Sequence, residues 1–182
     1  MHFRKIVGEK VYLSPRSVDD AIKYTEWLSN YEIAKYVQQY TKIITVDGEK
    51  EYLAKNDTNS YNFAIVDNHT DELIGSISLM DIDYINRTAE LGIFIGEENH
   101  LSKGYGSEAI MLTLNYGFNF LNLNNIMLKV YSFNERTQKA YKKCGFKEFG
   151  VWKKSHYAEG KYYDVVFMNI MKDDFNKKKE LH

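Results

Sequence analysis

Residues 87–121 read RTAELGIFIGEENHLSKGYGSEAIMLTLNYGFNFL, and they combine a strand pattern with a helix pattern. The first ten residues are mainly apolar and predict a strand. The apolar residues from Ile110 onward belong to a segment in which we expect a helix from about Gly104 to Leu121. Gly104 and Gly106 fall where the strand gives way to the helix. The stretch therefore predicts a glycine-bearing turn at a helix start.

Such a turn can bind an anion. The N–H groups of a first helical turn have no partner inside the helix and carry partial positive charge, so they suit a phosphate. Gly104 and Gly106 leave the backbone uncovered, Lys103 adds a cation, and Ser107 adds a hydrogen-bond donor. The alternative is that the glycines only shape a tight turn. The pattern is neither a Walker loop nor G-x-G-x-x-G, because Ala109 occupies the third glycine position.

The remaining segments predict a mixed α/β (α+β) fold with a mainly antiparallel sheet. We expect a strand at 10–13, helices at 17–28, 30–37 and 46–56, an antiparallel meander at 61–67, 72–82 and 87–96, a strand at 125–131, a helix at 134–145, and a hairpin at 146–157 and 162–171. The helix between 87–96 and 125–131 makes those two strands a right-handed, parallel unit. Residues 1–172 are expected to form one domain, and residues 173–182 a solvated polar tail.

Two helices carry local signals. Ser17 and Asp20 resemble a capping box, with Ala21, Ile22, Thr25 and Leu28 on one face. Asn134 is a plausible N-cap of the 134–145 helix, and Gly145 its C-terminal stop.

Composition excludes several classes of protein. The chain has 182 residues, of which 44% are hydrophobic, and a formal net charge of -1. That suits one globular domain and argues against a nucleic-acid binder, which normally carries a basic stripe. The single cysteine, Cys144, allows no internal disulfide, and no Cys/His cluster has metal spacing. His69, His100 and His156 are expected in turns or at the surface. Without a signal peptide or membrane-spanning run, a cytoplasmic protein is expected.

Several segments together resemble the GNAT superfamily of acetyl-CoA-dependent N-acetyltransferases. They are AELGIFIG, LSKGYGSEAI, NYGF and LNLNNIMLKVYSFNERTQKAYKKCGF, supported by VYLSPRSVDDA, Trp27 and GKYYDVVFMNIM. The resemblance is strongest to the branch holding ribosomal-protein and spermidine acetyltransferases and covers nearly the whole chain. It implies the GNAT fold, with a splayed parallel strand pair, and acetyl-CoA as cosubstrate.

The resemblance also implies a cofactor site. The family turn Q/R-x-x-G-x-G/A, which holds the pyrophosphate of coenzyme A, corresponds to Leu101, Ser102, Lys103, Gly104, Tyr105 and Gly106, followed by Ser107. Leu101 departs from the pattern and removes one donor. Pantetheine is expected between Ile93, Phe94 and Ile95 on one side and Asn134 on the other, although Asn134 can serve as a simple N-cap.

The reaction needs a base for the amine and a proton for the departing thiolate, since a free alkylamine with a pKa of roughly 10 is mostly protonated at neutral pH. By resemblance, Tyr141 is the candidate acid and Glu90 the candidate base, directly or through water. The alternatives are a packed aromatic for Tyr141 and an exposed strand-end carboxylate for Glu90. Direct attack in a ternary complex is expected, and Cys144 is expected to be a packed residue that forms no acyl-enzyme.

The acceptor stays open from the sequence. A protein N-terminus, a polyamine, an amino sugar or another small amine fits the chemistry, and residues 27–36 and 154–163 are expected to shape the pocket. Glu26, Glu32 and Glu159 could attract a cationic amine or could be solvated. Relatives are often homodimers. The competing class is a non-catalytic acyl-CoA sensor of the same fold, which Leu101 keeps open, and a third is a regulator that binds nucleotide phosphates.

Overall fold

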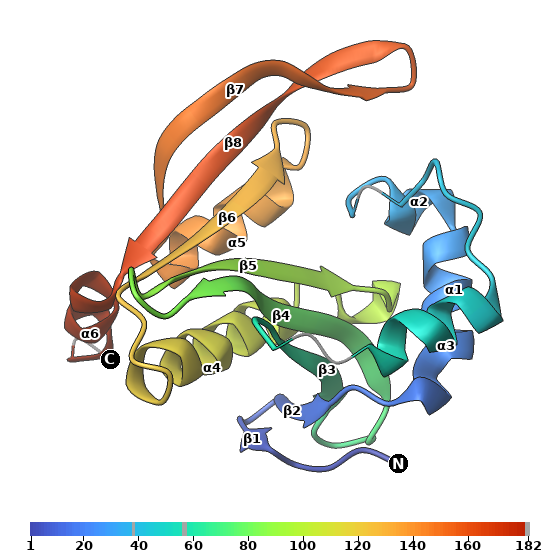
Figure 1. Cartoon of the computed structure of the whole chain (residues 1–182), viewed down its shortest axis with the longest axis horizontal. Coiled ribbons are helices and arrows are strands. Elements are labelled where there is room, and N and C mark those ends of the chain that lie inside the picture. The colour runs from blue at the N-terminus through green and yellow to red at the C-terminus, as the bar shows by residue number, and fades with distance from the viewer. Residues whose placement is uncertain (38, 56–57, 181–182) are drawn as a thin grey trace.

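The computed structural model describes residues 1–37, 39–55 and 58–180, and its centre is one mixed sheet (Figure 1). Among the described residues the sheet has eight strands in the order β1-β2-β3-β4-β5-β6-β8-β7. The strands are β1 (Ile6–Val7), β2 (Val11–Pro15), β3 (Tyr61–Asp67), β4 (Leu73–Asp83), β5 (Thr88–Ile95), β6 (Asn125–Tyr131), β7 (Lys147–Ala158) and β8 (Lys161–Met171). All neighbours pair antiparallel except β5 and β6, which confirms the predicted fold class.

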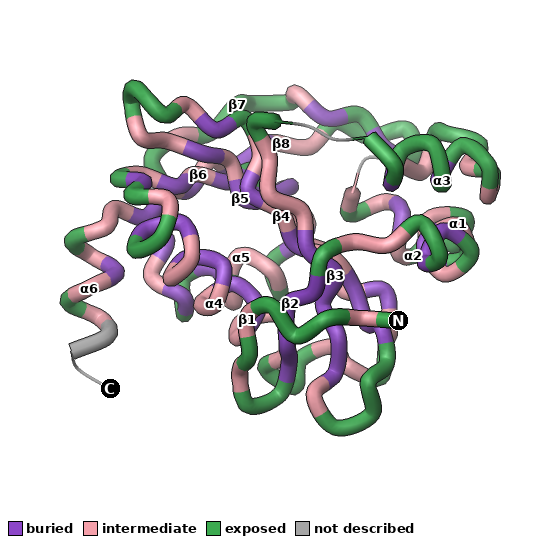
Figure 2. The backbone as a smooth tube through the Cα atoms, turned by 60° about the horizontal axis from the view of Figure 1, so that its bottom comes forward, coloured by how far each residue is buried: buried purple, intermediate pink, exposed green. Residues whose placement is uncertain are grey.

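Helices lie on both faces of the sheet. The helical segments are η1 (Val18–Asp20), α1 (Ala21–Ser29), α2 (Tyr31–Ala34), α3 (Val46–Ala54), η2 (Glu98–His100), α4 (Tyr105–Asn119), α5 (Glu135–Cys144) and α6 (Lys172–Glu180). Figure 1 shows α1, α2 and α3 grouped at one end of the molecule, with α4 running along the sheet. Most of the purple, buried backbone in Figure 2 belongs to the strands and to the sides of helices that touch them.

The sheet opens between its two parallel strands. β5 and β6 pair only at Thr88↔Asn125, Ala89↔Ile126 and Glu90↔Met127, although β5 continues to Ile95 and β6 to Tyr131. Along the same stretch β5 stays paired with β4 on its other edge, from Gly75↔Ile95 onward. The divergence expected from the resemblance is therefore present, and it begins directly after Glu90.

Side chains of β5 alternate between two apolar clusters, as a strand with period 2 requires. Leu91, Ile93 and Ile95 pack into the cluster beneath α4 and α5. Phe94 packs into the cluster beneath α1 and α3, where it meets Trp27 edge-to-face at 5.7 Å. Residues on the two faces of β5 can therefore act on opposite sides of the opening.

The face of the first helix differs from the prediction. Ser17 does act as a cap, but it caps the 3₁₀ turn η1 by accepting from the Asp19 N–H. The α-helix therefore starts only at Ala21, and a different side of it faces the sheet. That side buries Tyr24 and Trp27, whereas Ile22 is 60% exposed. The expected apolar face was therefore wrong at Ile22.

The segment expected to be a polar tail begins as helix α6. Phe175 within it is 1% exposed and packs against Phe118, with ring centroids 5.3 Å apart. One apolar residue thus docks this otherwise charged helix on the core. Residues 181–182 of the expected tail lie outside the described residues.

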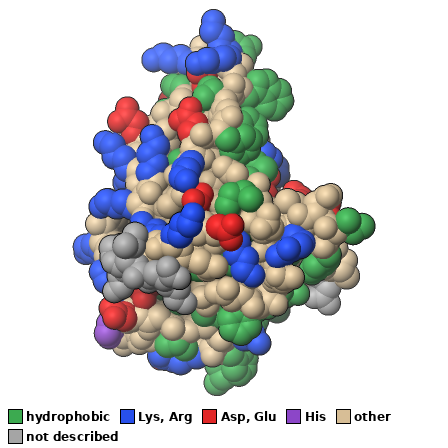
Figure 3. Space-filling model, turned by 90° about the vertical axis from the view of Figure 1, so that its left-hand side faces the viewer, with side chains coloured by type: hydrophobic (Ala, Val, Ile, Leu, Met, Phe, Trp, Pro, Cys, Tyr) green, Lys and Arg blue, Asp and Glu red, His purple; other side chains and the backbone are tan. Residues whose placement is uncertain are grey.

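The β7–β8 hairpin projects from the body of the molecule (Figure 1). Its exposed apolar side chains include Phe149, Trp152, Tyr157 and Tyr162. The face in Figure 3 shows hydrophobic side chains gathered along one edge and many Lys and Arg side chains beside them. Within the described chain, no helix is long and apolar enough to cross a membrane.

Candidate functional site

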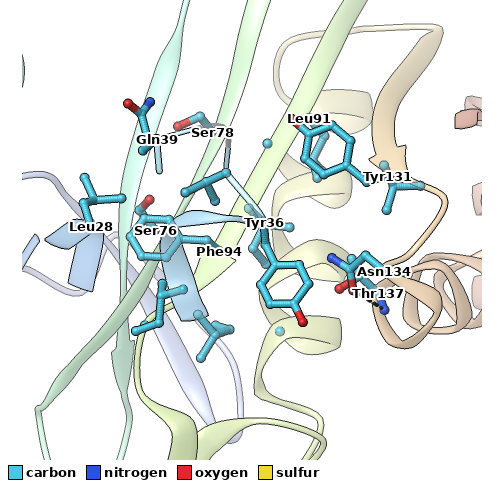
Figure 4. Close-up of a pocket in the computed structure, with 18 of the residues that line it drawn as sticks. Leu28, Tyr36, Gln39, Ser76, Ser78, Leu91, Phe94, Tyr131, Asn134 and Thr137 are labelled. Atoms are coloured by element: carbon cyan, nitrogen blue, oxygen red, sulfur yellow. Dashed lines mark hydrogen bonds between the residues drawn. The ribbon is translucent and has the colours of Figure 1, made fainter. Parts of the chain in front are cut away.

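A cavity of about 1100 Å³ occupies the opening between β5 and β6. It is lined from the α4 side by Gly106, Ser107 and Tyr141, and from the α1–α3 side by Tyr24 and Phe94. Residues of β4 and β5 form one wall, and residues of β6 and α5 form the other. Figure 4 shows Ser76, Ser78 and Phe94 on one side, Tyr131, Asn134 and Thr137 on the other, and Tyr36 between them. One cavity therefore reaches both faces of the sheet.

The start of α4 presents free backbone donors to this cavity. Gly104 caps the helix at φ 92°, and Ser102 also has a positive φ of 60°. The N–H groups of residues 104–107 donate to no acceptor in the described part of the chain, and the first helix-type bond runs from Glu108 N–H to Gly104 O. Free N–H groups at the start of a 15-residue helix provide the partial positive charge that an anion needs.

Nine of the eleven residues predicted to bind the cofactor line the cavity. They are Ile93, Phe94, Ile95, Leu101, Ser102, Gly104, Gly106, Ser107 and Asn134. Lys103 and Tyr105 are not among the lining residues. The carbonyl of Lys103 accepts from Lys10 Nζ at 2.8 Å, and the Tyr105 ring meets the His100 ring at 4.7 Å. Tyr105 therefore packs against the protein, whereas Lys103 is exposed outside the cavity.

Lys103 was expected to supply a positive charge for the anion, and another cation that the sequence analysis missed lies at the cavity instead. Arg136, near the start of α5, lines the cavity together with Leu101. Asn134 caps α5, since its Oδ1 accepts from the Thr137 N–H at 3.3 Å, and the residue also lines the cavity. The helix that Asn134 caps is thus fixed directly beside the opening.

Tyr141 reaches the cavity from the cluster beneath α4 and α5. It is 4% exposed and packs near Phe146 at 5.8 Å, and its hydroxyl makes no hydrogen bond to any residue that the structure describes. Burial raises the pKa of the Tyr141 phenol well above its ordinary value of 10. The phenol therefore keeps its proton and has it available for a group inside the cavity.

Glu90 lies on the opposite face of β5 from Leu91, Ile93 and Ile95, which is the face that Phe94 shares, and it lines the cavity. Its carboxylate accepts from Lys129 Nζ at 2.7 Å, and 19% of its side chain is exposed. Lys129 follows the last paired position of β6. A carboxylate thus stands where the strands separate, partly shielded and held by one ammonium.

Cys144 is a packed residue, as expected. It is 2% exposed, and its thiol donates to the Ser107 carbonyl at 3.7 Å. Burial raises the pKa of the Cys144 thiol to about 11, so the thiol stays protonated at neutral pH. This environment is unfavourable for a nucleophile.

The histidines differ partly from expectation. His69 is exposed in a turn, as predicted. His100 is half-buried and lies 3.1 Å from the Asp67 carboxylate, and His156 is buried with its ring stacked on Tyr131 at 3.9 Å. The surface assignment was therefore wrong for these two. No group of His, Cys, Asp or Glu among the described residues could hold a metal ion.

Of the three acidic residues considered for amine recognition, Glu32 lines the cavity and is paired with Lys35. Glu26 borders a separate shallow groove, and Glu159 is not among the lining residues. Glu49 was missed, although it is buried and lines the cavity. Its surroundings in sequence, VDGEKEY, are typical of a solvated helix and gave no signal.

Comparisons with known proteins agree with this geometry. A family model described as an acetyltransferase (GNAT) domain matches residues 10–147. The N-acetyltransferase p20 of Bacillus licheniformis is 30% identical over 172 residues, covering 92% of this chain and 96% of the relative. The spermidine N(1)-acetyltransferase of Vibrio cholerae is 35% identical over 116 residues, covering 64% of this chain and 66% of the relative. A crystal structure of the Vibrio cholerae spermidine N-acetyltransferase in complex with CoA and spermine superposes with a TM-score of 0.84 at 28% identity, covering 93% of this chain and 99% of that one.

Proposed function

The chain belongs to the GNAT family and is an N-acetyltransferase that uses acetyl-CoA, and from this premise we propose that it acetylates a primary amine by direct attack in a ternary complex. The observation that carries the proposal is the single cavity that opens to both faces of the sheet. Acetyl-CoA enters beside α4, and the amine enters beside α1 and α3. The two substrates then meet between β5 and β6 without an acyl-enzyme.

The N–H groups at the start of α4 bind the diphosphate of the cosubstrate, and the arm that carries the thioester follows β5 into the opening. Ile93, Phe94 and Ile95 present backbone groups along one side of the arm, and Asn134 lies on the other. Beyond Glu90 the β6-facing edge of β5 has no strand partner, so an N–H on that edge can bind the developing oxyanion.

Glu90 and Tyr141 perform the two proton transfers from opposite faces. Glu90, on the acceptor side, removes a proton from the incoming ammonium directly or through a water molecule, while Lys129 orients its carboxylate. The amine then attacks the thioester carbonyl, the carbon–sulfur bond breaks as the tetrahedral intermediate collapses, and the nitrogen releases its second proton through water, which restores the proton that Tyr141 gives up. Tyr141, on the cofactor side, donates its proton to the departing thiolate. The phenol is neutral at pH 7 and can hydrogen-bond to the thiolate, but burial raises its pKa and so makes it a weaker acid than an exposed tyrosine.

A polyamine is the acceptor that the site and the relatives favour. The cavity contains the carboxylates of Glu32, Glu49 and Glu90 on the side where the amine enters. The structurally similar Vibrio cholerae enzyme was crystallised with spermine. Cations also line this cavity, and Glu32 and Glu90 are paired with Lys35 and Lys129. Glu49 has no ion pair within the described chain, so it is the carboxylate that supports attraction of a polycation.

The test combines calorimetric titration with acetyl-CoA and a thiol-release assay over a panel of polyamines, amino sugars and peptides. We expect binding of acetyl-CoA and thiol release with at least one polyamine. Binding without release for any amine would instead support the acyl-CoA sensor, and preferential binding of ATP over coenzyme A would support the nucleotide regulator. The expected homodimer stays a prediction that sedimentation can measure.

A further inference from the structure

One buried carboxylate in the cavity has no role in the chemistry described above. Glu49 on α3 is 7% exposed, lines the cavity, and forms no hydrogen bond or ion pair through its side chain with any described residue. A buried carboxylate without a partner is costly, because it loses hydration and gains nothing in return. Burial accordingly raises the pKa of Glu49, with Arg16 opposing the shift.

A second unpartnered group lies in the same part of the cavity. The hydroxyl of Tyr24, a residue that is 2% exposed, is buried and has no hydrogen-bond partner among the described residues. Tyr24 and Glu49 belong to the contacting helices α1 and α3, and the charges of Asp20, Arg16 and, more weakly, Glu49 act on the Tyr24 hydroxyl. Arg16 lies over the Tyr52 ring at 5.2 Å and makes no ion pair with Glu49 within the described chain. The carboxylate therefore keeps its capacity to accept hydrogen bonds from a ligand.

Part of the cavity wall beside Tyr24 is apolar and suits a hydrocarbon chain, since the Tyr24 and Phe94 ring centroids lie 6.1 Å apart. Phe94 and Leu28 supply apolar surface, and Ser76 lies beside them on β4 (Figure 4). Glu90 lies further along the same cavity, at the point where the amine is expected to react. The cavity thus offers two separate carboxylates, joined by a partly apolar wall.

We propose that Glu49 and Tyr24 form a distal subsite that binds a second ammonium group of a diamine or polyamine acceptor. The inference rests on the proposed acetyltransferase function and adds the residues by which the same site would recognise the second ammonium of its acceptor. The distal ammonium donates to the Glu49 carboxylate and to the Tyr24 oxygen, so both buried groups gain a partner. The methylene chain lies along Phe94, and the other amine reaches the thioester near Glu90. A monoamine has nothing to place in the subsite.

The test compares 1,4-diaminobutane with butylamine, which share a four-carbon chain but differ in the second ammonium. Wild-type protein is expected to show a lower KM for the diamine. Glu49→Gln keeps the size of the side chain and should raise the diamine KM about tenfold or more, with little change for butylamine and for acetyl-CoA affinity. Glu51→Gln on the exposed part of α3 removes the same charge outside the cavity and should leave all three values unchanged.

Tyr24→Phe gives an independent measurement, since it removes only the hydroxyl; it should raise the diamine KM severalfold and leave butylamine unaffected. Equal KM values for the two amines in the wild type, or an equal rise for both in Glu49→Gln, would overturn the subsite. If the wild type acetylates neither these two amines nor any amine of the panel, the proposed function fails on its own. Calorimetry with 1,4-diaminobutane on the coenzyme A-loaded protein then decides the subsite: weaker binding to Glu49→Gln than to Glu51→Gln upholds it, and equal binding refutes it.

Discussion

Replacing Gly104 by alanine tests the turn that is proposed to hold the diphosphate. Gly104 has φ 92°, a region that costs an L-residue roughly 1–2 kcal/mol. The new Cβ would lie 3.3 Å from Lys10 Nζ, which is the far end of a flexible side chain and can move away cheaply. Lower entropy of the unfolded chain returns about 0.4–1 kcal/mol. The net loss of stability is therefore about 1 kcal/mol, which lowers the Tm by about 2–4 °C in a domain of this size.

The effect on coenzyme A follows from the same strain. If the free protein relieves the strain by rearranging the turn, binding must restore the turn, and about 1 kcal/mol weakens the affinity roughly fivefold. Calorimetric titration with coenzyme A measures the Kd, and thermal melts with and without coenzyme A measure the stability.

Two alanine variants serve as controls. At Gly106 the new Cβ would make an ordinary contact, 3.6 Å from Ile95 Cγ1, and at Gly150 on β7 no atom lies within 4 Å. Gly150→Ala should leave the Kd within about twofold of the wild type, because Gly150 does not line the cavity and needs no positive φ. Gly106→Ala should leave the Tm unchanged, since Gly106 needs no positive φ either, but it should weaken the Kd because Gly106 lines the proposed diphosphate site. A lower Tm for Gly104→Ala with an unchanged Kd would show that the diphosphate binds elsewhere. An unchanged Tm would refute the strain argument itself.

Four further substitutions test other parts of the site and the fold. Tyr141→Phe should lower kcat about a hundredfold, the low end of acid catalysis, with unchanged acetyl-CoA affinity in calorimetry; unchanged turnover would remove Tyr141 from the mechanism. Glu90→Gln should lower kcat/KM most at low pH, where the amine is protonated, and a uniform pH–rate profile would argue for water as the base. Burial raises the folded-state pKa of Glu49 above its ordinary 4.5, so the folded protein loses stability as the pH rises from 4.5 through the raised value. Glu49→Gln should therefore have a higher Tm than the wild type at pH 7 and the same Tm below pH 4.5. A lower Tm for Glu49→Gln at pH 7 would contradict the desolvation argument. Phe175→Ala should cost about 3–5 kcal/mol in urea unfolding, whereas a loss below 1 kcal/mol would mean that α6 is not docked.

Local signals explain why much of the fold could be predicted from the sequence. Asn134 and Gly145 mark both ends of α5 through backbone preferences that need no tertiary contact, and the structure confirms both. The alternation along β5 likewise fixes its two faces. The resemblance then supplied the position of the opening, which no local pattern encodes.

The features that were missed depend on packing between distant segments. Ile22 falls on the expected apolar face of its helix, but the preceding 3₁₀ turn changes which side meets the sheet. Glu49 lies in a charged run, and only the closure of α1 over α3 buries it. His156 is buried because aromatic rings from β6 and from the chain before α3 surround it.

The short ladder between β5 and β6 has a consequence for how the protein responds to its cosubstrate. Past Glu90 and Met127 the facing edges of these strands have no interstrand partners, so water must hydrate them in the free protein. The pantetheine arm of coenzyme A contains two amides and can substitute for a strand there, completing the sheet from outside the polypeptide. Binding of the cosubstrate should therefore stabilise the association of the two halves of the sheet, β1–β5 and β6–β8. Hydrogen exchange of the backbone amides along β5 should slow when coenzyme A is present.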